Sequence, residues 1–275
     1  MSSWLFCLSL LSRRTFTGNI RFLIMCYDIK TKVEAALKRA RHYGNQEAVQ
    51  MLIEQFRPFL EEELFHVSGF QHPKLLIYTS ENYKLPVVAS WGLIPYWVKN
   101  EQQQLDIWNK TINARGESIF EKPSFRTSAK SKRCLVYIDG FFEHHHFAGK
   151  TYPFYIQRVD GEPIVLGGLW DEWTNKDTGE VVNSFTIVTT KANNLMQKIH
   201  NNPKLKEARM PLILSEEDAD RWLNESADVA KKIIVPAPEG LLKAHTVRRL
   251  RGKNAVGNSP EAVEEFIYPE LKFSA

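Results

Sequence analysis

The chain has 275 residues, of which 43% are hydrophobic and 25% charged, the composition of an ordinary globular protein. Its formal net charge is +4, but residues 1–24 supply three of the 36 basic residues and no acidic one, so the remainder carries 33 basic against 32 acidic residues. Bulk charge therefore gives no argument for a nucleic-acid partner, and any such partner must be held by a local patch. No apolar run approaches the length of about 20 residues needed to span a bilayer.

The cysteine content limits the class of protein further. Three cysteines (Cys7, Cys26 and Cys134) cannot form a disulfide framework and lack the spacing of metal ligands. We therefore expect no metal and no other cofactor. So few cysteines suit a reducing compartment.

Residues 1–24 combine several Ser and Arg with a short apolar run over residues 5–11. A secretory signal would carry its positive charge before that run, whereas Arg13 and Arg14 follow it. A mitochondrial transit peptide fits the composition better, and a start codon assigned too far upstream fits equally well, with Met25 as the true initiator. We favour the mis-assigned start, and none of the three interpretations makes this segment part of the fold.

Apolar residues recur at helical spacing in four stretches. The predicted helices cover residues 32–43, 45–56, 191–200 and 215–223. Gly44 ends the first helix, Asn45 can cap the second, and Pro58 ends it. Ser215, followed by acidic residues, is a typical start for the last.

From residue 75 the apolar pattern changes to that of short strands. Strands are predicted over residues 75–79, 85–90, 134–138, 152–157, 164–169, 185–190 and 212–214. Turn signals stand at Asp139-Gly140, at Asp160-Gly161 and at Asp177-Thr178-Gly179. Strands dominate without a regular βαβ alternation, so we expect an α+β fold around a barrel-like, mainly antiparallel β core with flanking helices. The pattern over residues 243–275 is weak.

Cys26 directly follows Met25, and its chemistry depends on which residue begins the mature chain. At a free N-terminus it carries an α-amine and a thiol, with ordinary pKa values of about 7.7–8.0 and about 8.5. The amine can attack an aldehyde to give a Schiff base, and the neighbouring thiol can then close a thiazolidine ring. An internal cysteine that opens a strand is the simpler interpretation of this stretch, and such a residue could not do both.

Two short motifs carry polar groups that patterning alone does not explain. Asn113-Ala-Arg115-Gly-Glu117 gathers an amide, a guanidinium and a carboxylate, although the start of a helix with a solvated face would account for it. Glu143 follows two aromatic residues at the end of an apolar strand. Aromatic surroundings raise the pKa of a carboxyl group, as a general acid requires, whereas a glutamate that points to water from a hairpin has no such role.

The histidines suggest a metal site only at first sight. His144, His145 and His146 are consecutive, and neighbouring residues on a strand face opposite ways, so we expect an exposed loop rather than a chelating site. His200, taken alone, is a loop histidine. Cys134 lies in an apolar strand, and we expect it to be a buried small hydrophobic residue.

Eight blocks, taken together and in order, resemble the SRAP family, the SOS response-associated peptidase-like proteins that process abasic sites in DNA. The blocks are Met25-Cys26, Trp91-Gly-Leu-Ile-Pro95, Asn113-Ala-Arg115, Pro123-Ser-Phe-Arg126, the run from Arg133 to Glu143, Gly168-Leu-Trp170, the run from Phe185 to Thr190, and His200 with Arg209-Met-Pro211. The resemblance runs from Met25 to about Trp222. It implies a single domain, which we expect over residues 25–235, followed by a tail over 236–275 that could pack on it.

The resemblance also implies a chemistry, in which the N-terminal cysteine crosslinks to the ring-opened sugar of an abasic site in single-stranded DNA. Cys26 matches the nucleophile, and Asn113 matches the asparagine that orients its amine and the sugar. Glu143 matches the carboxyl group that assists ring opening and proton transfer. His200 matches the histidine that assists formation and reversal of the Schiff base.

The same resemblance supplies candidate DNA contacts. Arg115 matches a phosphate-binding arginine, and Arg126 is a second candidate. The loop that packs against or wedges bases is matched by Trp91, Ile94, Pro95 and Trp97. The chain departs from the family pattern where the usual Cys-Gly-Arg start reads Cys26-Tyr27-Asp28, so a DNA-contacting arginine is replaced by an acid. The loop between His200 and Arg209 is also longer than in many members.

Three functions follow as hypotheses. The first is an enzyme of the DNA damage (SOS) response that crosslinks to abasic sites in single-stranded DNA, with strand cleavage by a lyase step as an added activity. The alternative is a thiol peptidase, or autopeptidase, that uses Cys26 with His200 and Asn113, and the third is a non-catalytic single-strand binder. We expect a cytoplasmic monomer, nucleoid-associated if bacterial, with abasic single-stranded DNA as its partner and no membrane contact.

Overall fold

The computed structural model describes residues 27–43, 46–47, 49–51, 53–54 and 63–271. Its strands are β1 (Asp28–Thr31), β2 (Leu64–Ser68), β3 (Lys74–Thr79), β4 (Val87–Trp91), β5 (Asn113–Arg115), β6 (Arg133–Ile138), β7 (Gly140–Phe147), β8 (Lys150–Arg158), β9 (Ile164–Thr174), β10 (Val181–Lys191), β11 (Arg209–Pro211), β12 (Ile213–Leu214) and β13 (Leu242–Thr246). Its helices are α1 (Val33–Tyr43), α3 (Glu101–Trp108), α4 (Arg126–Ser131), α5 (Asn194–Ile199), α6 (Glu216–Asn224) and α7 (Ala227–Ile233). Among these residues, no helix is both long and apolar enough to cross a membrane.

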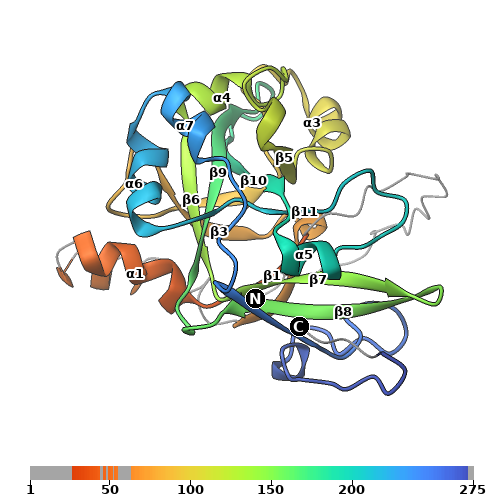
Figure 1. Ribbon diagram of the computed structural model, residues 1–275. Coiled ribbons are helices and arrows are strands. Elements are labelled where there is room, and N and C mark those ends of the chain that lie inside the picture. The colour runs from red at the N-terminus through yellow and green to blue at the C-terminus, as the bar shows by residue number, and fades with distance from the viewer. Residues whose placement is uncertain (1–26, 44–45, 48, 52, 55–62, 272–275) are drawn as a thin grey trace, which may run out of the picture.

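The strands form two sheets that lie one above the other in Figure 1. In the larger sheet, β10, β4, β3, β6 and β9 follow one another, and β9 also pairs with β10, so these five strands close into a barrel. The smaller sheet has the order β13-β8-β7-β1-β2. Most pairs are antiparallel, whereas β10 pairs in parallel with β4 and β5. The predicted α+β fold with a barrel-like β core is thus confirmed.

Strand β6 shows why the barrel strands have nearly continuous apolar sequences. Alternate side chains point to opposite faces of a strand. Cys134, Val136 and Ile138 belong to the cluster that also contains Trp91 and Phe185. Leu135 and Tyr137 belong to a second cluster with Trp222 of α6. Because both faces are covered, every position of β6 is buried, and the prediction that Cys134 is buried is confirmed.

One local prediction was wrong, and it concerns the strand that follows the turn signal at Asp139-Gly140. At that turn the chain passes from β6 in the barrel to β7 in the smaller sheet. The residues His144, His145 and His146 do not form an exposed loop, since they lie half-buried in β7 and pair with β8. The continuation of β7 depends on β8, a partner that the local pattern does not reveal.

The predicted helices agree with the structure to different degrees. The first appears as α1 and the last as α6, whereas the helix predicted over 191–200 is the shorter α5, because Lys191 still belongs to β10. The second predicted helix is only partly described, and the described residues among 46–54 are helical. Residues 1–26 lie outside the described part.

The segment after residue 241 joins the smaller sheet. β13 pairs with β8 along its whole length, from Leu242 opposite Arg158 to Thr246 opposite Phe154. The chain then crosses the face of the sheet that points away from the barrel (Figure 1, blue). There a third apolar cluster forms, consisting of Phe142, Tyr155, Val247, Leu250 and Ala262. The C-terminal segment therefore lies directly behind the strand that carries Glu143.

We predict that Gly140→Ala destabilises the fold through the joint between the two sheets. A β-carbon at residue 140 would lie 2.5 Å from the Ile156 carbonyl oxygen and 2.5 Å from the Tyr155 ring, too close for either group. Overpacking of this kind costs about 1–3 kcal/mol. Chemical denaturation should show this loss of unfolding free energy, with Thr151→Ala at an exposed position of β8 as control. Equal stability of the two variants would contradict the steric argument.

Candidate active site and nucleic-acid interface

Glu143 and His200 meet in the interior of the protein. Each is 1% exposed, and His200 Nδ1 lies 3.6 Å from Glu143 Oε2. Glu143 comes from β7, whereas His200 directly follows α5, which lies above β7 in Figure 1. The other carboxylate oxygen, Oε1, accepts a hydrogen bond from the backbone N–H of His144 at 2.9 Å. The structure thus excludes the water-facing glutamate and brings together the two groups predicted to transfer protons.

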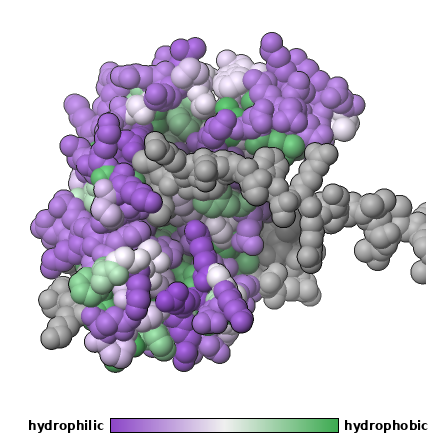
Figure 2. All heavy atoms as spheres, turned by 90° about the vertical axis from the view of Figure 1, so that its right-hand side faces the viewer, coloured by the Kyte–Doolittle hydropathy of each residue, from purple (hydrophilic) through white to green (hydrophobic). Residues whose placement is uncertain are grey.

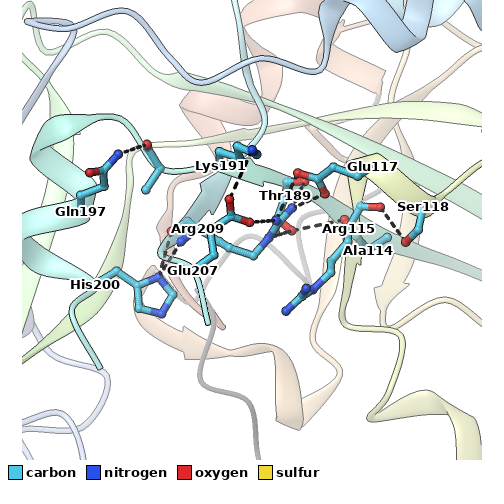
Figure 3. Close-up of polar contacts among 11 residues, drawn as sticks. Ala114, Arg115, Glu117, Ser118, Thr189, Lys191, Gln197, His200, Glu207 and Arg209 are labelled. Carbon is cyan, nitrogen blue, oxygen red and sulfur yellow. Dashed lines mark hydrogen bonds and ion pairs between the residues drawn. The ribbon is translucent and has the colours of Figure 1, made fainter. Parts of the chain in front are cut away.

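The strand that returns from His200 fixes the orientation of its ring. His200 Nδ1 lies 2.9 Å from the Arg209 carbonyl oxygen and 3.3 Å from the Arg209 backbone nitrogen, and the shorter contact requires an Nδ1–H donor (Figure 3). A neutral imidazole that donates from Nδ1 keeps its lone pair on Nε2. His200 also caps α5, because its backbone N–H donates to the Met196 carbonyl at 2.8 Å. Both ends of the residue are therefore held by backbone.

Arg209 connects this histidine to the Asn113–Glu117 motif. Its guanidinium is buried and donates to Glu117 Oε2 at 2.7 Å and to the Thr189 carbonyl at 2.9 Å (Figure 3). Burial alone would raise the pKa of Glu117, but the hydrogen bonds and the charge of Arg209 hold that pKa below its ordinary value. The ion pair fixes the position of the motif relative to β11. This role of Arg209 was not predicted from the sequence.

The Asn113–Glu117 motif is not the start of a helix. Asn113 and Arg115 lie in β5, which pairs in parallel with β10, and a single 3₁₀ turn follows. Asn113 is 7% exposed, whereas Arg115 is exposed, and its guanidinium points away from the Glu117–Arg209 pair in Figure 3. The motif thus combines a buried amide with an outward-pointing cation.

The predicted wedge loop is mostly interior. Trp91 and Ile94 are 0% exposed, and the Trp91 indole N–H donates to the Ile112 carbonyl at 2.9 Å. Pro95 is buried as well. Only Trp97 is partly exposed, next to Tyr96, whose exposed fraction of 58% the sequence did not lead us to expect. Within this loop, the ring surfaces available for stacking are those of Tyr96 and Trp97.

Arg126 lies at the start of α4, close to the same loop. It is exposed, and the Trp97 indole N–H donates to the carbonyl of Pro123, three residues earlier, at 3.3 Å. Arg126 and Trp97 therefore belong to one region of the surface, away from the buried Glu143–His200 pair.

Cys26 lies outside the described residues, but the chain that follows it is well defined. The Tyr27 carbonyl accepts a hydrogen bond from Gly69 N–H at 2.6 Å, and Asp28 stands opposite Phe142 where β1 pairs with β7. Phe142 immediately precedes Glu143. The strand that follows the predicted nucleophile thus runs beside the strand that carries the predicted acid.

Asn201 links the segment around His200 to β7, the strand that carries Glu143. Its amide oxygen accepts from the His146 backbone N–H at 2.7 Å, and its amide nitrogen donates to the His146 carbonyl at 3.0 Å. Nearby, His145 Nδ1 lies 2.9 Å from the Lys198 carbonyl. These contacts join the outer half of β7 to the segment around His200. Asn201 was not predicted as a site residue.

A surface hollow of about 570 Å³ opens beside His200. Its polar lining includes Lys191, Gln197, Asn201 and Lys206. Figure 2 shows that the side of the molecule at which the β7–β8 hairpin ends is mostly hydrophilic among the described residues. Within the same residues, no group of three or more His, Cys, Asp or Glu could hold a metal ion. The Glu207 carboxylate also lines the hollow and lies 3.5 Å from Lys191 Nζ, so the hollow combines basic, amide and acidic groups.

We predict that Asn201→Ala releases the outer part of β7. The His146 amide loses its acceptor, and a hydrogen bond of this kind contributes about 0.5–1.5 kcal/mol. Hydrogen exchange followed by NMR should show the His146 amide exchanging about tenfold faster. Asn224→Ala, on the exposed surface of α6, is the matched control. Unchanged exchange at His146 would show that Asn201 does not hold this strand.

The model of the family described as SOS response associated peptidase (SRAP) matches residues 31–254. The chain is 35% identical over 223 residues to the abasic site processing protein YoqW of Bacillus subtilis, covering 78% of this chain and 93% of that protein. It is 28% identical over 208 residues to the abasic site processing protein HMCES of Xenopus tropicalis, covering 66% and 58%. A crystal structure of a protein from Bacteroides thetaiotaomicron superposes with a TM-score of 0.76 at 34% identity, covering 88% of this chain and all of that one. The chain belongs to the SRAP family.

Proposed function

We propose that this protein processes abasic sites in DNA and does so by covalent capture through Cys26 at the N-terminus of the mature chain. The observation that supports this proposal best is the buried Glu143–His200 pair, which lies beside the strand that begins two residues after Cys26. Relatives from a bacterium and a vertebrate are both named abasic site processing proteins. A buried proton-transfer pair next to a nucleophilic terminus suits capture of a sugar aldehyde.

The proposed reaction releases one molecule of water. The α-amine of Cys26 adds to C1′ of the ring-opened sugar, and the carbinolamine loses water to give an imine. The thiol sulfur then adds to the imine carbon, its proton passes to nitrogen, and a thiazolidine ring closes. Glu143 would supply the proton that opens the sugar ring, and His200 Nε2 would carry protons during formation and loss of the imine.

The remaining predicted residues have separate roles in this proposal. The buried amide of Asn113 would orient the amine and the sugar. The exposed guanidinium of Arg115 would bind a phosphate of the strand, since its fork of donors matches two phosphate oxygens. Single-stranded DNA suits this proposal because Tyr96 and Trp97, in a surface region away from the Glu143–His200 pair, offer ring surfaces to unpaired bases further along the strand.

A thiol peptidase that uses Cys26, His200 and Asn113 is the alternative, in keeping with the description of the family. The two functions differ in what they require of the terminus. A peptidase needs only the thiol, whereas the crosslink also needs the free amine, because an amide nitrogen cannot form an imine. Strand cleavage would likewise need the amine, since it proceeds from the Schiff base.

We predict that Cys26→Ser abolishes a heat-stable adduct with single-stranded DNA that carries an abasic aldehyde. Serine keeps the amine but lacks the thiol that closes the ring. Denaturing electrophoresis of protein whose N-terminus is verified by intact mass provides the measurement. An adduct that survives in Cys26→Ser, or one formed by a chain that still begins at Met1, would rule out the proposed nucleophile.

We predict that Glu143→Gln slows adduct formation about a hundredfold and leaves noncovalent DNA binding unchanged, because the amide has a similar shape but cannot donate an acidic proton. Rates at saturating DNA should be compared with those of Glu172→Gln, a control at an exposed position of β9. Equal rates in the two variants would remove Glu143 from the chemistry.

We predict that Arg115→Ala weakens binding of single-stranded DNA of any sequence. Removing one phosphate contact should lower the slope of log K against log salt by about 0.7. Titrations at several salt concentrations test this, with Arg221→Ala on α6 as the control, since Arg221 is exposed and paired with Asp218. An unchanged slope would remove Arg115 from the DNA contacts.

A further inference from the structure

The C-terminal segment carries the most basic stretch of the described chain that the proposed function leaves unused. Residues 243–260 contain five lysines and arginines and no acid. Four of these bases fall in the basic loop, residues 248–253, namely Arg248, Arg249, Arg251 and Lys253. All four are exposed. Because the bulk of the chain is nearly neutral, this loop is a local patch of the kind that a nucleic-acid partner would need.

The loop is fixed rather than free. Leu250 is 5% exposed and packs in the cluster with Phe142 and Val247. The Val256 backbone N–H donates to the Arg249 carbonyl at 3.1 Å. Asn258 donates to the Glu63 carbonyl at 3.0 Å and accepts from the His66 backbone N–H at 3.1 Å, which ties the segment to β2. The bases are therefore presented by a backbone with a defined path.

Arg251 reaches the start of β1. Its Nη2 donates to Asp28 Oδ2 at 2.7 Å, and His66 Nε2 lies 3.7 Å from the same oxygen. Asp28 is 2% exposed, whereas the Arg251 side chain is 55% exposed. Burial would raise the pKa of Asp28, but the contact with His66 and the charge of Arg251 hold that pKa below its ordinary value.

The geometry of this ion pair leaves most of the guanidinium available. Arginine has five N–H donors in a rigid fork, Asp28 takes up one nitrogen, and 55% of the Arg251 side chain remains exposed. Asp28 lies two positions after Cys26 in the chain, which limits the distance between their α-carbons to about 7 Å. Asp28 stands opposite Phe142, which packs against Leu250 of the C-terminal segment, so the cation lies near the start of the mature chain on the face of the smaller sheet opposite Glu143.

We propose that the basic loop is a second phosphate-binding surface and that Arg251, anchored by Asp28, binds a backbone phosphate of the captured strand. This inference rests on the proposed function. Asp28 occupies the place where the family start would carry an arginine, and Arg251 supplies a guanidinium to the same place from 223 residues further along the chain. Arg249 and Lys253 extend the positive surface away from the site.

The test uses the full protein and single-stranded DNA that contains one tetrahydrofuran abasic analogue. The analogue has no aldehyde, so only noncovalent binding is measured. Arg251→Ala should weaken binding about fivefold at 0.1 M salt and lower the salt slope by about 0.7. Arg251→Lys should keep the slope, because it keeps the charge. Arg221→Ala, an exposed arginine whose carboxylate partner lies 2.9 Å away, should leave both quantities unchanged.

Asp28→Asn separates a phosphate contact from a purely structural role. If Arg251 binds phosphate, this variant keeps the cation and should bind within about twofold of the unmodified protein, with the same slope. If Arg251 only holds β1 in place, Asp28→Asn should lose as much affinity as Arg251→Ala, with unchanged slopes in both, and the inference is overturned. Melting curves of each variant exclude loss of the fold as the cause.

The inference and the proposed function can fail separately. Unchanged binding and slope in Arg251→Ala, with normal adduct formation on aldehyde-containing DNA, would overturn the inference alone. Absence of any adduct in the unmodified protein, with the Arg251 effect present on the tetrahydrofuran strand, would overturn the covalent function alone.

Discussion

A carboxylate and an imidazole buried together impose the strongest constraint on this fold. Glu143 and His200 are each 1% exposed, and polar groups removed from water are costly unless they keep polar partners. The partners here are largely backbone: the His144 N–H for Glu143 and the Arg209 carbonyl for His200. Strand pairing sets the positions of these backbone groups. The distance between Glu143 and His200 therefore depends on the register of β7 and β11. The barrel and the smaller sheet are the means by which that register is held.

The residues of the candidate site come from separate strands and loops of the two sheets. Glu143 comes from the smaller sheet, whereas His200 and Asn113 come from segments packed on β10 of the barrel. Side-chain links connect these parts, among them the Asn201 amide against β7 and the Arg209 guanidinium against Glu117. Both lie away from the proposed reacting atoms. Their effect on chemistry would act through the distance between Glu143 and His200, where a shift of a few tenths of an ångström decides whether a proton can pass.

The sequence predicted what depends on local pattern and missed what depends on distant partners. Continuous apolar runs such as 134–138 predicted buried strands correctly, because burial on both faces removes polar alternation. The three-residue β5 and the short helices α4 and α7 were not predicted, since elements of this length carry little periodicity. Trp91 was predicted as a surface for bases, yet its ring stacks near Phe185 in the core, with centroids 6.2 Å apart. Nothing local distinguishes an aromatic residue that awaits a ligand from one whose partner lies 94 positions away.

The pairing of Asp28 with Arg251 bears on the protonation of the proposed amine nucleophile at Cys26. A carboxylate two residues from the α-amine would favour the ammonium form, which cannot attack an aldehyde. The guanidinium of Arg251 neutralises that carboxylate at 2.7 Å, and the burial of Asp28 concentrates the interaction on the pair rather than on the chain terminus. An acid at this position is therefore compatible with the proposed chemistry only while the C-terminal segment is folded against β1. The Asp28–Arg251 contact joins the start of β1 to the segment beyond β13, so that segment is part of the folded structure around the first described residues.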